Sequence, residues 1–202
     1  MGRRDSGTNR SFISGTVVEQ LYALSAAITK NNWTAIAAYT GVAGTNTVCS
    51  IPPGWFLNTN PNALGRGLYL EVHGTIQNTA AATFANAINI NPAVATTTNN
   101  IAINAAYTPT AAVTAPFKVE AQITCTAFTT SLMTLQINGK VEYQSVAAGG
   151  APTTGAQTAG FAGTWTALDP RVTQYLELFG TWSAANAANQ TVVQQMKLFG
   201  LN

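Results

Sequence analysis

Hydrophobic and polar residues alternate along much of the chain after residue 66, and a period of two is typical of β-strands. The cleanest example is residues 67–76, where Leu68, Leu70 and Val72 share one face and polar side chains share the other. We expect the apolar face to line a core. The same alternation predicts further strands at residues 83–90, 117–126, 171–182 and 191–199.

Asn138-Gly139 stands between two alternating runs, residues 132–137 and 140–146. Both residue types accept the positive φ values of a type I′ turn. The sequence therefore predicts a β-hairpin with its turn at these two residues. Residues 147–163, rich in Gly, Ala, Thr and Pro, are predicted to form a loop outside the core. Residues 92–115 are predicted to form a second long loop that holds a short strand.

Residues 17–28 fit both a helix and a strand, and we favour a strand because the rest of the chain reads as β. The predicted organisation is an N-terminal arm with a first strand at residues 1–30 and a sandwich domain at residues 31–202. Eight or nine strands, long loops and no clear helix predict an all-β fold. We expect a single β-sandwich with jelly-roll or Greek-key connections and an extended N-terminal arm.

Only 8% of the residues are charged, against about a quarter in ordinary soluble domains. No run of about 18 apolar residues marks a membrane span, so we expect no membrane partner. A surface with so little charge is expected to be covered by copies of the chain or by another protein. A net charge of +2 does not indicate nucleic-acid binding. Arg3, Arg4 and Arg10 are concentrated in the arm, and we expect them to dock on an acidic neighbour rather than form a solvated tail.

Few residues indicate catalysis or metal binding. His73 is the one histidine of the sequence, and a zinc site usually needs three or four ligands. No nucleophile motif or phosphate-binding loop is present. We therefore expect no enzyme, no metal and no cofactor. Cys49 and Cys125 are expected to be small buried hydrophobic residues, with a single disulfide or a reactive thiol as alternatives.

Aromatic residues in predicted loops are candidates for a binding surface. Trp55 follows a Pro-Pro-Gly turn, Tyr107 lies in the loop at 92–115, and Trp165 follows the Gly-rich loop. Such rings stack on sugars or on a neighbouring subunit, or else they close the open ends of the sandwich. The sequence leaves both interpretations open.

Three segments carry a family resemblance: residues 65–90, residues 116–125 and residues 175–201. Their order resembles that of the jelly-roll virion structural proteins of tailed bacteriophages, which include capsid decoration or cement proteins, head-fibre proteins and tail accessory proteins. The residues that match the two family motifs are Gly65, Arg66, Leu68, Gly74, Leu178, Trp182, Ser183, Ala185 and Asn189.

The resemblance implies a jelly-roll-like subunit, often a homotrimer, that binds the major capsid protein or another virion protein. It implies a capsid decoration or cement subunit that stabilises the particle and is located in the virion. Because no targeting motif is recognisable in the sequence, we expect the chain to be made and assembled in the host cytoplasm. The resemblance carries over no catalytic residues. The alternative is the carbohydrate- or receptor-binding head of a phage fibre or tail protein.

Overall fold

The computed structural model describes residues 10–13, 16–31, 37–38, 49–56, 66–78, 82–93, 98–104, 107–109, 113–129, 131–144, 157–184, 186, 188 and 189–201. These residues contain thirteen β-strands and no helix. None of them belongs to a helix long and apolar enough to cross a bilayer. The strands are β1 (Arg10–Ile13), β2 (Thr16–Ala23), β3 (Ile28–Asn31), β4 (Ala37–Ala38), β5 (Cys49–Ile51), β6 (Gly67–Gln77), β7 (Phe84–Asn91), β8 (Ile101–Ala102), β9 (Thr114–Phe128), β10 (Met133–Tyr143), β11 (Gln157–Leu168), β12 (Gln174–Trp182) and β13 (Gln190–Leu201).

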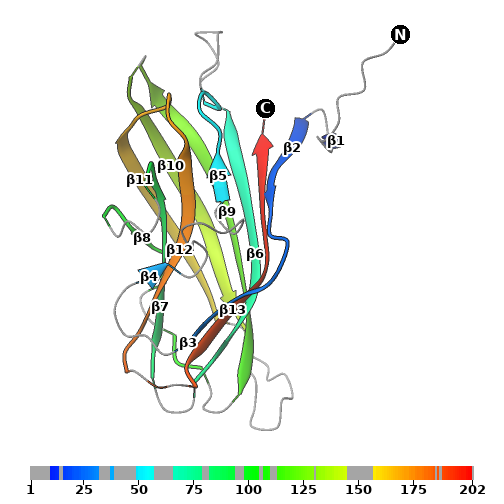
Figure 1. Ribbon diagram of the computed structural model, residues 1–202, viewed down its shortest axis with the longest axis vertical. Helices are drawn as coiled ribbons and strands as arrows, with labels where there is room; N and C mark the ends of the chain where they lie inside the picture. Colours follow the sequence, from blue (N-terminus) through cyan, green and yellow to red (C-terminus); the bar gives the residue numbers. More distant parts are fainter. Residues whose placement is uncertain are drawn as a thin grey trace.

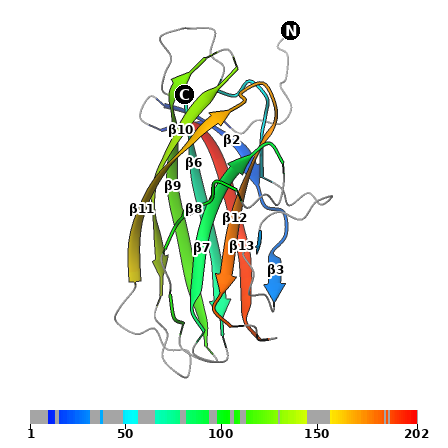
Figure 2. The ribbon, with the colours of Figure 1, turned by 90° about the vertical axis from the view of Figure 1, so that its left-hand side faces the viewer.

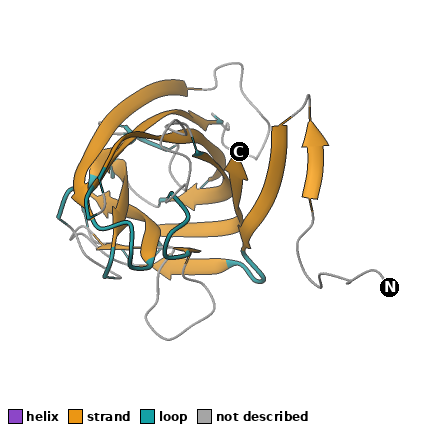
Figure 3. Cartoon of the chain, turned by 90° about the horizontal axis from the view of Figure 1, so that it is seen from above, coloured by secondary structure: helices purple, strands orange, loops and turns teal. Residues whose placement is uncertain are grey.

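The strands form two antiparallel sheets that face each other as a sandwich (Figures 1 and 2). The large sheet has the strand order β1-β2-β13-β6-β9-β10-β11, and β3 also pairs with β13. The small sheet has the order β4-β12-β7-β8, and β5 also pairs with β12. Viewed from above, the strands surround a common interior (Figure 3). The predicted all-β sandwich is confirmed.

The chain crosses between the sheets in a nested order. β6 leads to β7 in the small sheet, and β12 leads back to β13 in the large sheet. Because β6 pairs with β13 and β7 pairs with β12, the two crossings lie side by side. This pairing of early with late strands is how a jelly roll is wound. The strands between them differ, since β9, β10 and β11 form a meander within the large sheet.

The core lies between the sheets: long strands of the large sheet such as β6, β9 and β10 bury about every second side chain, and β7 and β12 of the small sheet bury most of theirs. Leu68, Leu70 and Val72 of β6 are fully buried, as their alternation predicted. The main predicted strands at 67–76, 83–90, 117–126 and 191–199 correspond to β6, β7, β9 and β13, and residues 174–182 of the predicted strand at 171–182 form β12. Burial of these apolar faces stabilises the fold by about 25 cal/mol per Å² of apolar surface. The largest fully buried side chains are Trp165, Trp182, Tyr143, Phe84, Phe179, Ile51, Leu68, Leu70, Ile76, Ile88 and Ile90.

The predicted hairpin at Asn138-Gly139 is wrong. β10 runs straight through both residues, and Gly139 pairs with Ala121 of β9 on one side and Phe161 of β11 on the other. The glycine serves close packing here. A Cβ atom at this position would lie 2.5 Å from both the carbonyl oxygen of Glu120 and the Phe161 ring. The residue is therefore selected for its missing side chain, not for a turn conformation.

The predicted loop at residues 147–163 is also corrected, because residues 157–168 form the long strand β11. Its core-facing side chains include Phe161 and Trp165, whose spacing fits a strand. The residues between them are Gly, Ala and Thr, which are frequent in loops, and they obscured this alternation. Residues 147–156 of that predicted loop lie outside the described residues.

The N-terminal region joins the large sheet. β2 and β3 both pair with β13, and β1 pairs with β2. The favoured strand at residues 17–28 corresponds mainly to β2, and the predicted domain boundary at residue 30 falls within β3. Arg3 and Arg4 lie outside the described residues, and Arg10 begins β1. The large sheet therefore starts before residue 31.

Candidate interaction surface

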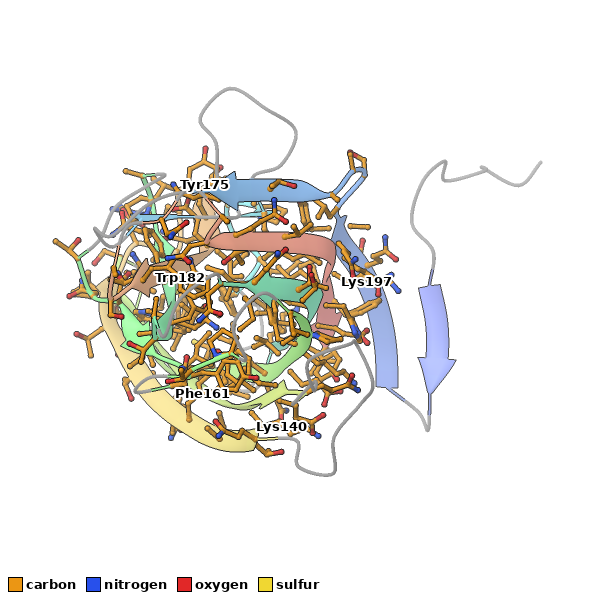
Figure 4. The ribbon with its side chains drawn as sticks, turned by 90° about the horizontal axis from the view of Figure 1, so that it is seen from below. Lys140, Phe161, Tyr175, Trp182 and Lys197 are labelled. Carbon is orange, nitrogen blue, oxygen red and sulfur yellow. The ribbon has the colours of Figure 1, made fainter. Side chains whose placement is uncertain are left out.

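The outward side of the large sheet carries a cluster of charged residues and one histidine from four neighbouring strands. We call this cluster the charged face. Lys140 and Lys197 lie at its two sides, whereas Phe161 and Trp182 point into the sandwich (Figure 4). The members of the charged face are Glu71 and His73 of β6, Lys118 and Glu120 of β9, Lys140 and Glu142 of β10, and Lys197 of β13.

Strand register brings these residues into two rows across the sheet. In the first row, Lys197 lies opposite Glu71, Glu71 opposite Glu120, and Glu120 opposite Lys140. In the second row, His73 lies opposite Lys118, and Lys118 opposite Glu142. Directly opposed side chains on one sheet face are close enough to interact. Alternation along each strand thus selects the face, and pairing between strands assembles the rows.

Glu120 is the centre of the charged face. Its carboxylate lies 2.8 Å from Lys118 Nζ and 3.1 Å from Lys140 Nζ, and it accepts a 2.8 Å hydrogen bond from the Tyr69 hydroxyl. These three hydrogen bonds lower the pKa of Glu120 to about 2, and the bond from Lys118 contributes most, ahead of those from Tyr69 and Lys140. Burial is the largest cause that raises the pKa of Tyr69 to about 12, and the hydrogen bond to Glu120 is the second. Glu120 therefore remains ionised and Tyr69 remains a neutral donor across the physiological range.

Most of the remaining members of the charged face are paired around this centre. Lys140 also lies 2.9 Å from Glu142, and its bonds to Glu142 and Glu120 raise its pKa. His73 Nε2 lies 2.8 Å from Glu71 Oε1. No group of three or more His, Cys, Asp or Glu residues that could hold a metal ion occurs within the described residues.

The charged face is close to neutral as a whole, because three lysines accompany three glutamates. Exposed uncharged polar side chains surround it, among them Gln122, Gln136 and Asn138. Covering a charge is costly when its partner is missing, and most of these charges have partners within the chain. The arrangement suits a surface that another protein covers, since the partner need not supply the missing ions.

Lys118 with Glu120 and Lys140 with Glu142 stand two positions apart in the sequence, which places each pair on one face of a strand. The sequence does not show that both lysines bind the Glu120 carboxylate, nor that Tyr69 does. Those contacts depend on the register of β9 with β10 and of β6 with β9. Tyr69 itself carried a usable sign, since alternation placed it on the polar face of its strand.

The structure corrects the candidate loop surface at Tyr107 and Trp165. Tyr107 is 4% exposed and stacks on Tyr143, with ring centroids 4.2 Å apart. Trp165 is 2% exposed, lies within β11 and donates a 3.0 Å hydrogen bond from Nε1 to the carbonyl oxygen of Asn99. Neither ring is available to stack on a ligand. These two residues agree with the other interpretation, in which the aromatic rings fill the sandwich.

Trp55 is only partly buried, but its ring is occupied by the chain itself. The Arg66 guanidinium carbon lies 5.0 Å from the ring centroid, and Arg66 Nη1 donates a 2.8 Å hydrogen bond to the Trp55 carbonyl oxygen. On β13, a Cβ atom at Gly200 would lie 2.1 Å from Trp55 Cζ2, so the ring packs directly on that backbone. Trp55 therefore ties the β5 region to the large sheet. Trp55, Tyr107 and Trp165 thus each pack against different residues of the chain.

Cys49 and Cys125 are both free and buried. Burial raises the pKa of each thiol, which keeps it protonated and unreactive in the folded chain. Cys125 Sγ also donates a 3.4 Å hydrogen bond to the Ala127 carbonyl oxygen. The expectation of small buried residues is confirmed for both.

No protein-family model matches the chain, and no curated protein matches it. Among solved structures, the chain is similar to the CBM2 module of the evolved Dit of Lactobacillus casei BL23 phage J-1. The similarity has a TM-score of 0.30 and 10% sequence identity, and it covers 92% of this chain and 96% of that chain. We draw no functional conclusion from a similarity of this size.

Proposed function

We propose that the chain is a structural virion protein, a capsid decoration or cement subunit that binds the particle surface and stabilises it without catalysis. The observation that carries the proposal is the charged face, a broad side of the large sheet whose charges are mostly paired within the chain. We assign this face to the contact with the particle. The resemblance of residues 65–90, 116–125 and 175–201 to phage virion proteins supports the same role.

The physical argument concerns the cost of covering the face. A partner that buries an unpaired ion must supply a counter-ion or leave the charge without solvent, which costs several kcal/mol. Glu120 already has two lysine partners, and Lys140 has two glutamate partners. The surrounding Gln, Asn and Thr side chains offer hydrogen bonds to a partner of many compositions. The homotrimer and the capsid contacts of Arg3, Arg4 and Arg10 remain part of the proposal.

The test is binding to particles. We expect the chain in purified virions, at a copy number related to capsid symmetry, and we expect purified protein to co-sediment with particles that lack it. Gln122→Glu adds a carboxylate to the outward face beside Glu120 and should weaken co-sedimentation at least tenfold. Val172→Glu changes an exposed residue outside that face and serves as the matched control. Absence from purified particles, with no co-sedimentation, contradicts the proposal.

A second candidate is the receptor-binding head of a fibre or tail protein, and one observation favours it. Tyr69 and Phe199 form a partly exposed aromatic pair on the outward side of the large sheet, with ring centroids 6.3 Å apart. Gln122 lies opposite Tyr69 in register and offers an amide beside the rings. A sugar would stack on such a pair. Glycan-array binding that is lost in Phe199→Ala would support this function, and no binding on a broad array would count against it.

A further inference from the structure

β11 forms one end of the large sheet and has a long free edge. It is twelve residues long, and within the described residues it pairs with β10 alone. Figure 2 shows it at the margin of the molecule, with no strand drawn beyond it. In an antiparallel pair, every second residue directs its N–H and C=O groups away from the partner strand. Half of the β11 backbone therefore presents hydrogen-bonding groups at this edge.

Edge strands usually carry features that prevent pairing with another chain, such as charge, proline or very short length. The small sheet follows this rule at one end, because its end strand β8 has two residues. β11 has neither a charged residue nor a proline in its sequence QTAGFAGTWTAL. Its outward side chains are small and exposed: Thr158, Gly160, Ala162, Thr164 and Thr166. On the outward side of β11, the described residues therefore present no charge and no bulky side chain to a second strand.

The inner side of β11 holds the strand in place. Phe161 and Trp165 are buried in the core, and the Trp165 indole donates a hydrogen bond to Asn99. The pairing with β10 is regular from Gln157 to Trp165 and is interrupted only beyond Trp165, where Ala167 has a φ of 58°. An incoming strand would therefore find an edge that is already extended and ordered, which reduces the entropy lost on pairing.

We propose that β11 of one copy pairs antiparallel with β11 of a second copy across a two-fold axis, which joins two large sheets into one continuous sheet. The occupant is a second copy because an uncharged strand meets no like charge when it pairs with itself, whereas a charged partner would gain no ion pair there. A two-fold contact is also self-complementary and closed, which limits growth into a fibre.

The size of the contact sets the expected strength. The regular part of β11 spans nine residues, or about 30 Å at 3.4 Å per residue. With a sheet thickness of about 10 Å, the edge covers a few hundred Å² on each copy, which in total is below the roughly 1,000 Å² that a stable specific interface buries. We therefore expect a dimer that dissociates on dilution.

The first test is mass as a function of concentration, by light scattering or sedimentation. We expect the mass to double at high concentration, from one chain of 21.1 kDa to two chains, or from the proposed homotrimer to six chains. Ala162→Lys places a charge at the edge in both copies and should weaken association at least tenfold. Asn138→Lys changes the residue paired with Ala162 on β10, one strand further from the edge, and should change it less than twofold. A monomer or a trimer at every concentration overturns the pairing, as does a dimer that Ala162→Lys leaves unchanged.

The second test fixes the geometry. Single cysteines are introduced at Thr158, Gly160, Ala162 and Thr164, and the variants are mixed in pairs under oxidising conditions. Two-fold antiparallel pairing predicts that efficient disulfides form only between positions whose residue numbers add to one constant. The wild type should give no link, because its two thiols are buried. Links without a constant sum overturn the pairing. Neither test uses particles, so failure here is distinct from failure of the proposed particle binding.

Discussion

Glu120→Gln tests whether the charged face is a bonded network in solution. The substitution keeps the size of the side chain and removes its charge. It weakens three interactions at once, with Lys118, Lys140 and Tyr69. We expect the variant to fold, with a lower free energy of unfolding at neutral pH and a flatter dependence of that free energy on pH.

The magnitude follows from the pKa and from exposure. A fall in pKa from 4.5 to about 2 corresponds to an upper limit of about 3 kcal/mol, at about 1.36 kcal/mol per unit. The Glu120 side chain is 20% exposed, so solvent screens part of this energy. Two partly exposed ion pairs contribute about 0.2–1 kcal/mol each, and the bond from Tyr69 to a charged acceptor about 1.5 kcal/mol. We therefore expect a loss of about 2 kcal/mol.

The direction of the pH effect follows from the lowered pKa. The folded chain holds Glu120 ionised more strongly than the unfolded chain does. Its stabilisation is thus fully present above the unfolded pKa of 4.5 and is lost as the pH falls toward about 2. Urea unfolding, followed by tryptophan fluorescence between about pH 7 and pH 2, measures this loss. Wild type and Glu120→Gln should differ by about 2 kcal/mol at pH 7 and converge at the acid end.

Glu142→Gln is the matched control, since Glu142 lies on the same face and pairs with Lys140 alone among the described residues. It should cost less than about 1 kcal/mol at neutral pH, so a larger loss in Glu120→Gln reports the additional bonds of Glu120. If wild type and Glu120→Gln instead lose stability in parallel as the pH falls, the bonds at Glu120 do not persist in solution. The proposal that a partner covers the charged face would then lose the internal pairing that supports it.

Three further substitutions or treatments test the packing of the sandwich. Gly139→Val forces methyl groups into the neighbouring strands and should lower the free energy of unfolding by about 3 kcal/mol, which is measured as a lower Tm. A Gly→Val change in an exposed loop should leave the Tm nearly unchanged. Trp165→Phe removes the hydrogen bond to Asn99 and leaves a gap, with an expected loss of about 2 kcal/mol in urea unfolding. Cys49 and Cys125 should react with a thiol reagent only after unfolding, and rapid labelling of the folded chain would contradict their burial.

The all-β fold was predictable because an apolar face must repeat every two residues in a strand that borders one core. β6 and β9 show this repeat almost without interruption, and both were predicted close to their observed bounds. The errors lay where a residue type has two uses. Gly139 was assigned to a turn because glycine accepts positive φ, yet it occurs where two strands approach too closely for a side chain. Local sequence does not distinguish these uses, because the neighbours that crowd Gly139 come from β9 and β11.

The candidate site was less predictable than the fold for a related reason. Alternation assigns a residue to a face, but only strand order shows which faces of distant strands adjoin. Glu71 and Glu120 are 49 positions apart in sequence and lie directly opposite each other in the sheet. Two like charges in register are unfavourable by themselves, and the lysines in the same two rows offset them. The pairing of residues within one strand was visible in the sequence, and the network across strands was not.

The few charges of this chain are unevenly distributed in space, and the two proposed contacts use different parts of that distribution. Six of its Lys and Glu residues gather on the charged face, where most of them are paired, while the twelve residues of β11 at the end of the same sheet carry no charge. A paired face presents side chains and suits a partner with its own shape. An uncharged edge presents backbone groups and suits another strand. A charge on β11 would oppose strand pairing, and an unpaired charge on the charged face would be costly for a partner to cover. The lack of charge on β11 and the internal pairing of the charged face therefore favour the two proposed contacts by different means. A substitution at Gln122 should affect only the proposed particle contact, and one at Ala162 only the proposed pairing of β11.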